Sequence, residues 1–306
     1  MKFAKLIKYL LFPDIWCSAV RFNKDDNTSI LNDTVNQFTV IKDTYRYWTA
    51  DPFLVKENGK YYLFFEVYDR LKRKGLLGYR EISDNSFGDI KIIYESKKHL
   101  SYPFIYKKGD AYYIVPESNK QGELFRLKCT EFPDKWEKDT VLTKDSLVDT
   151  TIYTDNDGVN YYISERVDER NVFDRVDIFY EENGELKECR SNPVKTDASN
   201  ARGAGKLFEF EDKLIRPSQD CGKAYGEKLN FNQVISISKN GYEEKLYRTI
   251  SVNEIKLDKD DYFNGIHTYN RLDNVEVIDI KMPNKFNILS TLGAVIKLIK
   301  KFFDRC

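Results

Sequence analysis

A repeat of about fifty residues runs through the chain and constrains its fold more than any other feature. Each copy combines a short apolar strand, a polar turn and a second strand rich in β-branched or aromatic residues. The five copies are DPFLVKENGKYYLFFE (51–66), YPFIYKKGDAYYIVPE (102–117), TTIYTDNDGVNYYISE (150–165), GKLFEFEDKLIRPSQD (205–220) and, more loosely, IHTYNRLDNVEVIDI (266–280). Their starts differ by 51, 48, 55 and 61 residues. Hairpins at this period are typical of propeller blades, so we predict an all-β, five-bladed β-propeller over residues 13–284.

The segments between the hairpins supply the remaining strands of the blades. Outer strands are visible at 75–82 and 122–129. Residues 16–22 and 38–41 have strand character and lie before the first repeat. We expect them to complete the last blade, because that would close the ring and protect its edges.

Both ends of the chain carry apolar residues at helical spacing. We predict an amphipathic helix over 1–12 and a basic amphipathic helix over 285–306. In the second, Lys297, Lys300 and Lys301 alternate with apolar turns. Two interpretations stay open: the helices pack on the propeller or on each other, or they lie on an anionic membrane surface.

Composition narrows the function classes and the compartment. Lys plus Arg and Asp plus Glu number 49 each, which argues against a nucleic-acid partner. The five cysteines are scattered without a CxxC pair, so we expect no metal site and no disulfide framework. No nucleotide-binding glycine loop is evident, and we expect no cofactor. Lys5 and Lys8 interrupt the first apolar run, so we expect a cytoplasmic protein, with the inner face of the membrane as its peripheral contact.

Acidic residues recur at matching positions of the repeats and are the candidate catalytic groups. In four repeats the second strand ends on an acid, fifteen residues after the first strand begins. Those acids are Glu66, Glu117, Glu165 and Asp220. Asp51 begins the first repeat, and Asp149 stands one residue before the third. Because the two points are neighbours across a hairpin, the blades should bring these acids to one mouth of the channel, where crowding suits acid–base chemistry.

The surroundings of the acids separate their expected roles. The aromatic run TYRYW flanks Asp51 and ends in Trp48, which is a candidate for substrate binding, and two threonines follow Asp149. We therefore expect Asp51 and Asp149 to bind a ligand. Glu66 and Glu165 are expected to bind loop amides or to pair with arginines.

Further candidates for substrate binding lie in two stretches and at two other repeat starts. ARGAG (201–205) contains Arg202, and RPSQDCGKAYG (216–226) contains Arg216, Gln219, Asp220 and Tyr225. Such a set binds sugar hydroxyls, or a phosphate through arginine; the alternative is a buried ion-pair network that organises loops. Tyr102 and His267 begin the second and fifth repeats at equivalent places and join the candidates.

Six motifs carry a resemblance to a known family. They are WTADPF, HLSYPF, YYIVPES, VDTT, ARGAG and RPSQDCGKAYG. Over roughly residues 40–245 the chain resembles the N-terminal propeller domain of the plant glucosamine inositolphosphorylceramide transferases and its stand-alone bacterial relatives. That domain in turn resembles the five-bladed propellers of glycoside hydrolase family 43.

The resemblance to family 43 implies roles for two acids and exposes a departure. Asp51 matches the family's general base, and Asp149 matches the carboxylate that orients the general acid. The family's general acid is a glutamate that opens blade four, but TDASNARGAG (196–205) contains only Asp197, outside the family's register. Glu117 from blade two is a candidate substitute.

Three functions are consistent with these observations, and we expect an enzyme. The first is transfer of a glycosyl or phospho-sugar group in surface polysaccharide or glycolipid biosynthesis, with Asp51 or Asp149 as base. In that reaction Arg202 and Arg216 would face a phosphate-bearing leaving group, which needs little protonation. The second is a glycoside hydrolase, which needs both an acid and a base. The third is a non-catalytic glycan-binding or scaffold domain that partners a separate glycosyltransferase.

Overall fold

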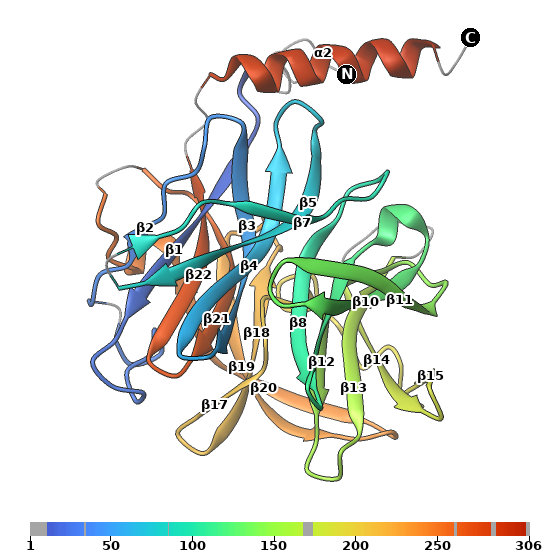
Figure 1. Cartoon of the computed structure of the whole chain (residues 1–306). Coiled ribbons are helices and arrows are strands. Elements are labelled where there is room, and N and C mark those ends of the chain that lie inside the picture. The colour runs from blue at the N-terminus through green and yellow to red at the C-terminus, as the bar shows by residue number, and fades with distance from the viewer. Residues whose placement is uncertain are drawn as a thin grey trace.

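The computed structural model describes residues 11–33, 35–84, 86–167, 174–259, 262–282 and 286–303. These residues form five antiparallel sheets that surround a central channel as the blades of a propeller, with one helix across one end (Figure 1). The predicted five-bladed, all-β fold is therefore confirmed. The predicted helix over 1–12 falls almost wholly on residues 1–10, which lie outside the described residues.

The first three blades follow the order of the chain. Blade one contains β3 (Tyr47–Glu57), β4 (Lys60–Asp69), β5 (Lys74–Ser83), β6 (Ser86–Phe87) and β7 (Lys91–Tyr94). Blade two contains β8 (Ser101–Lys108), β9 (Ala111–Glu117), the 3₁₀ turn η1 (Asn119–Gln121), β10 (Leu124–Glu131) and β11 (Lys135–Thr143). Blade three contains β12 (Leu147–Thr154), β13 (Asn160–Arg166), β14 (Arg175–Glu182), β15 (Glu185–Glu188) and β16 (Lys195–Thr196).

The last two blades close the ring. Blade four contains β17 (Phe208–Phe210), β18 (Lys213–Asp220), β19 (Lys228–Ile237) and β20 (Tyr242–Ser251), followed by the 3₁₀ turn η2 (Val252–Glu254). Blade five contains β21 (Ile266–Leu272), β22 (Val275–Met282), β1 (Ile15–Phe22) and β2 (Thr39–Val40). β1 pairs with β22 along its whole length and with β2 on its other side. The N-terminal strands thus complete the last blade, as their strand character predicted.

The apolar cores lie between neighbouring blades. Phe53 and Phe64 of blade one pack in the same cluster as Phe104 and Ile114 of blade two. Another cluster joins blades four and five. Each strand therefore alternates between two sheet faces that are both covered, which explains the aromatic-rich, nearly continuous apolar runs of the repeats.

Helix α2 (Ile288–Phe303) confirms the predicted C-terminal helix and lies across the end of the propeller where β3 begins and β4 ends (Figure 1). Asn287 caps it, because its Oδ1 accepts a hydrogen bond from Ser290 N at 3.1 Å. Within the described ranges, no helix combines the length and the apolar character needed to cross a membrane.

Candidate functional site at the channel mouth

The inner strands of three blades share a local distortion that shapes the site. Asp51, Tyr102 and Asp149 have positive φ angles of 51°, 43° and 46°. Each lies in a β-bulge, where the register of the inner strand shifts against its neighbour. Bulges re-aim side chains, and left-handed non-glycine residues cost energy that the surrounding structure must supply. The distortion brings two blades into contact, since Tyr102 N donates a hydrogen bond to Asp51 Oδ2 at 3.0 Å.

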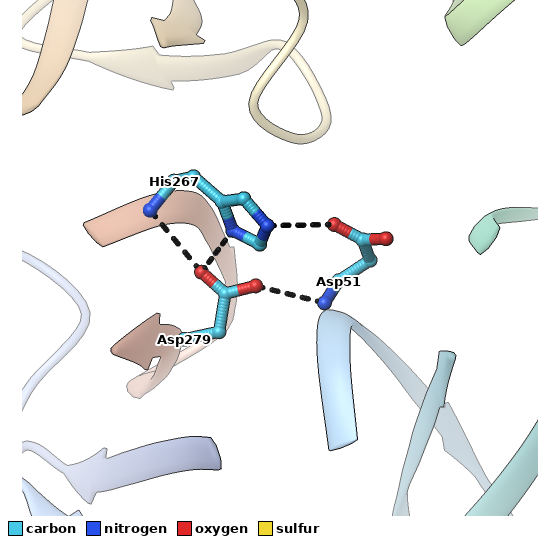
Figure 2. A group of neighbouring side chains, drawn as sticks. All are labelled: Asp51, His267 and Asp279. Atoms are coloured by element: carbon cyan, nitrogen blue, oxygen red, sulfur yellow. Dashed lines mark hydrogen bonds and ion pairs between the residues drawn. The ribbon is translucent and has the colours of Figure 1, made fainter. Parts of the chain in front are cut away.

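Asp51 faces an Asp–His pair from blade five (Figure 2). Asp279 Oδ1 lies 2.6 Å from His267 Nδ1 and accepts backbone N–H groups of His267 and Thr268, while Oδ2 accepts Asp51 N at 2.8 Å. His267 Nε2 points toward Asp51 Oδ1 at 3.8 Å. Asp279 therefore holds the imidazole in one orientation, with its second nitrogen directed at Asp51.

Burial and charge shift both titrating groups of this pair. Burial raises the pKa of Asp51 to about 6, even though the nearby His267 works in the opposite direction. Burial disfavours protonation of His267, but the Asp279 carboxylate outweighs it and raises the pKa of the imidazole. Asp51 is thus ready to accept a proton near neutral pH.

An aromatic wall borders this pair. The Trp16 ring stacks on His267 with centroids 3.8 Å apart, and Tyr225 meets the imidazole edge-on at 5.2 Å. Gly226 is required here, because it has φ of +64° and a Cβ would lie 2.7 Å from the Trp16 ring. Tyr225 keeps 44% of its surface exposed, so it offers an aromatic face at the mouth.

On the opposite side, Arg202 joins two acids of the set. Its Nε donates to Asp149 Oδ2 at 2.6 Å, and its Nη2 lies 3.7 Å from Glu117 Oε2. The guanidinium also lies 4.9 Å from the Tyr225 ring centroid. Gln219 Nε2 reaches Asp149 Oδ2 at 3.3 Å. Arg202, Gln219, Asp149, Glu117 and Tyr225 are therefore brought together, as their positions in the repeats predicted.

Three glutamates at the strand ends, Glu66, Glu117 and Glu165, are buried, and burial raises the pKa of each. Neither carboxylate oxygen of Glu165 has a hydrogen-bond partner among the described residues, and burial raises its pKa to about 8. Glu66 Oε1 likewise lacks a hydrogen bond; His99 Nε2 lies 3.6 Å away, and burial raises the pKa of Glu66 well above its usual value. No hydrogen bond from a loop amide reaches Glu66 Oε1 or either oxygen of Glu165 among the described residues, whereas the positive charges of Arg202 and Arg216 do act on Glu165, in line with the expected alternative of pairing with arginines. Burial together with Asp149 also raises the pKa of Glu117 well above its usual range.

Three candidates, Arg216, Tyr102 and Trp48, take places other than the mouth surface. Arg216 is buried against Glu244, with Nε–Oε2 at 2.7 Å, and donates to backbone oxygens of residues 200 and 201. It is a structural ion pair and does not face a ligand, which was the alternative considered for this stretch. Tyr102 is fully buried and its hydroxyl accepts a hydrogen bond from Gly205 N, linking blades two and four. Trp48 stacks on Tyr68 at 4.5 Å and is nearly buried.

The prediction that Asp220 lies at the mouth with Glu66 and Glu117 is wrong, because the strand register of blade four differs from that of the other blades. The first strand of blade four is short, and the bond from Gln219 N to Arg202 O sets the alignment near the mouth. Gln219 therefore takes the place that Glu66 and Glu117 hold in their blades. Asp220 Oδ1 accepts the N–H of Gly222 and shapes the following loop instead.

The sequence predicts no metal site, but the structure brings together three side chains of metal-ligating types. Asp51, His267 and Asp279 offer ligand atoms within 4.8 Å of one another. However, the Asp279 oxygens already accept N–H groups from Asp51, His267 and Thr268. This donor-saturated carboxylate suits a histidine-orienting role better than metal ligation.

The repeats do not predict two residues of the site, Asp279 and Trp16. Asp279 lies one residue before the end of the fifth segment, whose register was loose. Trp16 lies outside the repeats and reaches His267 only because β1 joins blade five. A search for the acid of the fifth repeat would have found Asp279.

Known proteins with similar sequences show the family of the chain. Residues 21–282 match the family model described as glucosamine inositolphosphorylceramide transferase 1, N-terminal. The chain belongs to this family. It is 31% identical over 205 residues to glucosamine inositolphosphorylceramide transferase 1 of Oryza sativa subsp. japonica, covering 64% of this chain and 27% of the rice protein. The Arabidopsis thaliana protein of the same name is 30% identical over 206 residues, covering 64% of this chain and 26% of its own length. The chain thus corresponds to about a quarter of these plant relatives.

Solved structures support the fold alone. A GH62 hydrolase in complex with xylotriose superposes with a TM-score of 0.54 at 12% identity, over 76% of this chain and 91% of that one. The GH62 α-L-arabinofuranosidase of Coprinopsis cinerea gives 0.54 at 11% identity, over 89% and 97%. The native Bacillus subtilis arabinanase gives 0.50 at 12% identity, over 76% and 93%.

Proposed function

We propose that the channel mouth binds carbohydrate and that the protein transfers a glycosyl or phospho-sugar group to an acceptor hydroxyl. The observation that carries this proposal is Asp51, buried and directed at an imidazole that Asp279 orients. Membership of a family whose named plant members are transferases supports transfer as the class of reaction. Assembly of a surface polysaccharide or glycolipid is the setting we propose.

The residues at the mouth suggest a division of roles. Asp51 takes the proton of the acceptor hydroxyl as that oxygen bonds to the sugar carbon or phosphorus, and the phosphate-bearing group leaves with its bonding electrons. Arg202 supplies the positive charge that would face that group, since Asp149 fixes its Nε and the guanidinium lies 4.9 Å from the centroid of the exposed Tyr225 ring. The exposed Tyr225 ring offers a face on which a pyranose can stack.

A second candidate, glycoside hydrolysis, is favoured by one observation. Burial and the neighbouring Asp149 raise the pKa of Glu117 well above its usual value, which favours the protonated form that a general acid needs. With Asp51 as base, the two acids would supply the pair that hydrolysis requires. A glycan-binding or scaffold role, with a separate glycosyltransferase as partner, is the third candidate.

Asp51→Asn tests the proposal. We expect turnover to fall at least ~100-fold, because the base is lost, while thermal stability changes by less than ~1 kcal/mol. Asparagine tolerates the left-handed backbone at this position and keeps an oxygen for Tyr102 N. Wild-type turnover should also rise with pH through about 6, as Asp51 ionises.

The assay offers sugar nucleotides with acceptor sugars on one arm and aryl pentosides in water on the other. Asp110→Asn, at the exposed turn between β8 and β9 and far from the mouth, is the matched control and should retain full activity. Release of aryl alcohol without transfer would favour hydrolysis. Sugar binding without turnover on either arm would favour the binding role, and a strongly destabilised Asp51→Asn protein would make Asp51 a structural residue.

A further inference from the structure

Helix α2 contacts the propeller through its small residues. A Cβ on Gly293 would lie 2.4 Å from Arg70 O and 2.5 Å from Leu71 O, so the helix backbone rests directly on the loop between β4 and β5. Arg73 Nη1 donates to Ser290 O at 3.2 Å, and Ala294 is fully buried. The contact is close, and it leaves no room for large side chains.

Five large apolar side chains of α2 consequently point away from the protein, while Ile296 lines the cleft between the helix and the blades. They recur at intervals of three and four residues, so they form one stripe along the helix. The stripe consists of Ile288, Leu292, Val295, Ile299 and Phe302, each between 42% and 66% exposed. A helix that only covered the propeller would bury these side chains and expose its small and polar ones. The stripe is therefore a surface for binding something else.

A basic cleft lies beside the stripe, between α2 and blades one and two. It has a volume of about 890 Å³. Its lining includes Lys97, Lys98, Lys120, Lys297 and Lys300. None of these five forms an ion pair with another residue that the structure describes, whereas the neighbouring Lys72 and Lys74 share Glu95. Positive charge without an ion-pair partner among the described residues is thus concentrated where α2 meets the propeller, and Ile296 of the cleft is the next residue along the helix after Val295 of the stripe.

We propose that α2 and the basic cleft dock the protein on an anionic lipid bilayer, with the helix lying in the interface plane. Helices that combine an apolar face with lysines bind the surface of anionic bilayers, because the apolar side chains enter the acyl boundary and the lysines attract the headgroups. The sixteen described residues of α2 span ~24 Å, less than the ~30 Å hydrocarbon layer, which suits a helix lying in the interface plane. A second copy of the chain is a poorer occupant, because a symmetric contact would bring two sets of the same lysines together.

The docked orientation turns the channel mouth toward the bilayer. In the β3–β4 ladder Tyr47 pairs with Asp69 next to α2, and Ala50 pairs with Glu66 three residues further along. His99 lines the cleft and lies 3.6 Å from Glu66, so cleft and mouth adjoin. The far tip of this hairpin, at Asn58 and Gly59, points away from the helix.

The test is flotation of the whole chain with vesicles of phosphatidylcholine alone or with a third phosphatidylserine, at 0.1 M and 0.5 M salt. We expect recovery with the anionic vesicles at low salt only. Lys97→Gln/Lys98→Gln should lower the partition coefficient at least tenfold, because each lysine near an anionic surface contributes to the free energy of binding. Leu292→Ser/Ile299→Ser should also lower it at least tenfold, because the variant loses apolar area that would be buried in the bilayer.

Matched controls exist on blades two and four. Ile235→Ser/Leu246→Ser removes two equally exposed apolar side chains, and Lys128→Gln/Lys245→Gln removes two exposed lysines on blades two and four. Both control pairs should float like the wild type. Unchanged melting temperatures separate loss of docking from loss of folding.

Hydrogen–deuterium exchange on the vesicles tests the orientation. Residues 69–74, 96–100 and α2 should become protected, and residues 57–60 should not. Equal flotation of all variants, or protection at 57–60, would overturn the proposal. So would a concentration-dependent dimer that Leu292→Ser/Ile299→Ser abolishes in a protein that does not float, because a second copy would then cover the stripe.

Discussion

Burial of the Glu165 carboxylate at the mouth lowers the stability of the fold when the group is ionised. Its side chain is 2% exposed and neither oxygen accepts a hydrogen bond from the described residues. A buried carboxylate in that state is disfavoured unless it is protonated. Such acids persist at functional sites because the same environment that destabilises the charge tunes it for chemistry.

The raised pKa of Glu165 makes the stability of the protein depend on pH. The folded pKa is about 8 and exceeds the ordinary value, so the folded state holds a proton that the unfolded chain releases above pH ~4.5. The stabilisation from this proton is present below pH ~4.5 and is lost as the pH rises through about 8.

Glu165→Gln should therefore stabilise the protein at pH 9 by ~2 kcal/mol and change it little at pH 4. Urea denaturation at both pH values measures the difference. Glu209→Gln, at an exposed position of β17, is the control and should alter neither value. A Glu165→Gln protein that is destabilised at pH 9 would show that the ionised carboxylate is paired.

At the scale of elements, α2 is joined to the propeller through its small residues and a few hydrogen bonds, such as that from Arg73 Nη1 to Ser290 O. Gly293 allows that contact, since two backbone oxygens lie where its Cβ would be. The blades, in contrast, are held by continuous ladders and by cores shared between neighbours. The helix should thus detach without unfolding the rest.

Gly293→Ala tests this independence. We expect faster hydrogen exchange across 288–300, because the methyl group pushes the helix off the β4–β5 loop. The intrinsic gain of alanine in a helix works in the opposite direction, so a free-standing α2 would become less exchangeable. The melting temperature of the propeller should stay within ~2 °C. Leu298→Ala, at an exposed helix position, is the control and should leave exchange unchanged.

At the scale of the whole molecule, one buried cluster fastens the closure of the ring. Glu276 on β22 accepts hydrogen bonds from Arg21 Nε at 2.5 Å, Asn23 Nδ2 at 2.8 Å and Ile30 N at 2.8 Å. Arg21 in turn donates to Asp33 O and lies 4.6 Å from the Phe38 ring centroid. These contacts tie the segment that precedes the first repeat to the last blade.

Glu276→Ala should destabilise the fold by ~3–5 kcal/mol, because it leaves Arg21 buried without its carboxylate. Chemical denaturation measures the loss. Glu81→Ala removes the exposed partner of Lys60 and should cost no more than ~1 kcal/mol. Equal costs for the two variants would mean that the closure relies on the β1–β22 ladder and not on this cluster.

The sequence by itself determined the number of blades, the closing strands and most of the acids at the mouth. Hairpin register is local, so an acid fifteen residues after a strand start must lie beside it, as Glu66 and Glu117 do. The left-handed backbone conformations of Asp51 and Asp149 could not be predicted from the sequence, because β-bulges depend on contacts between blades.

The tertiary structure alone decided which neighbours each side chain meets. Arg216 finds Glu244 on its own blade, and Trp16 finds His267 across the closure. The short first strand of blade four exchanges Asp220 for Gln219 at the mouth. These pairings join residues between 28 and 251 positions apart, and no periodicity along the chain encodes distances of that kind. The outward stripe of α2 has the same origin, because helical spacing reveals an apolar face but not the surface toward which it turns.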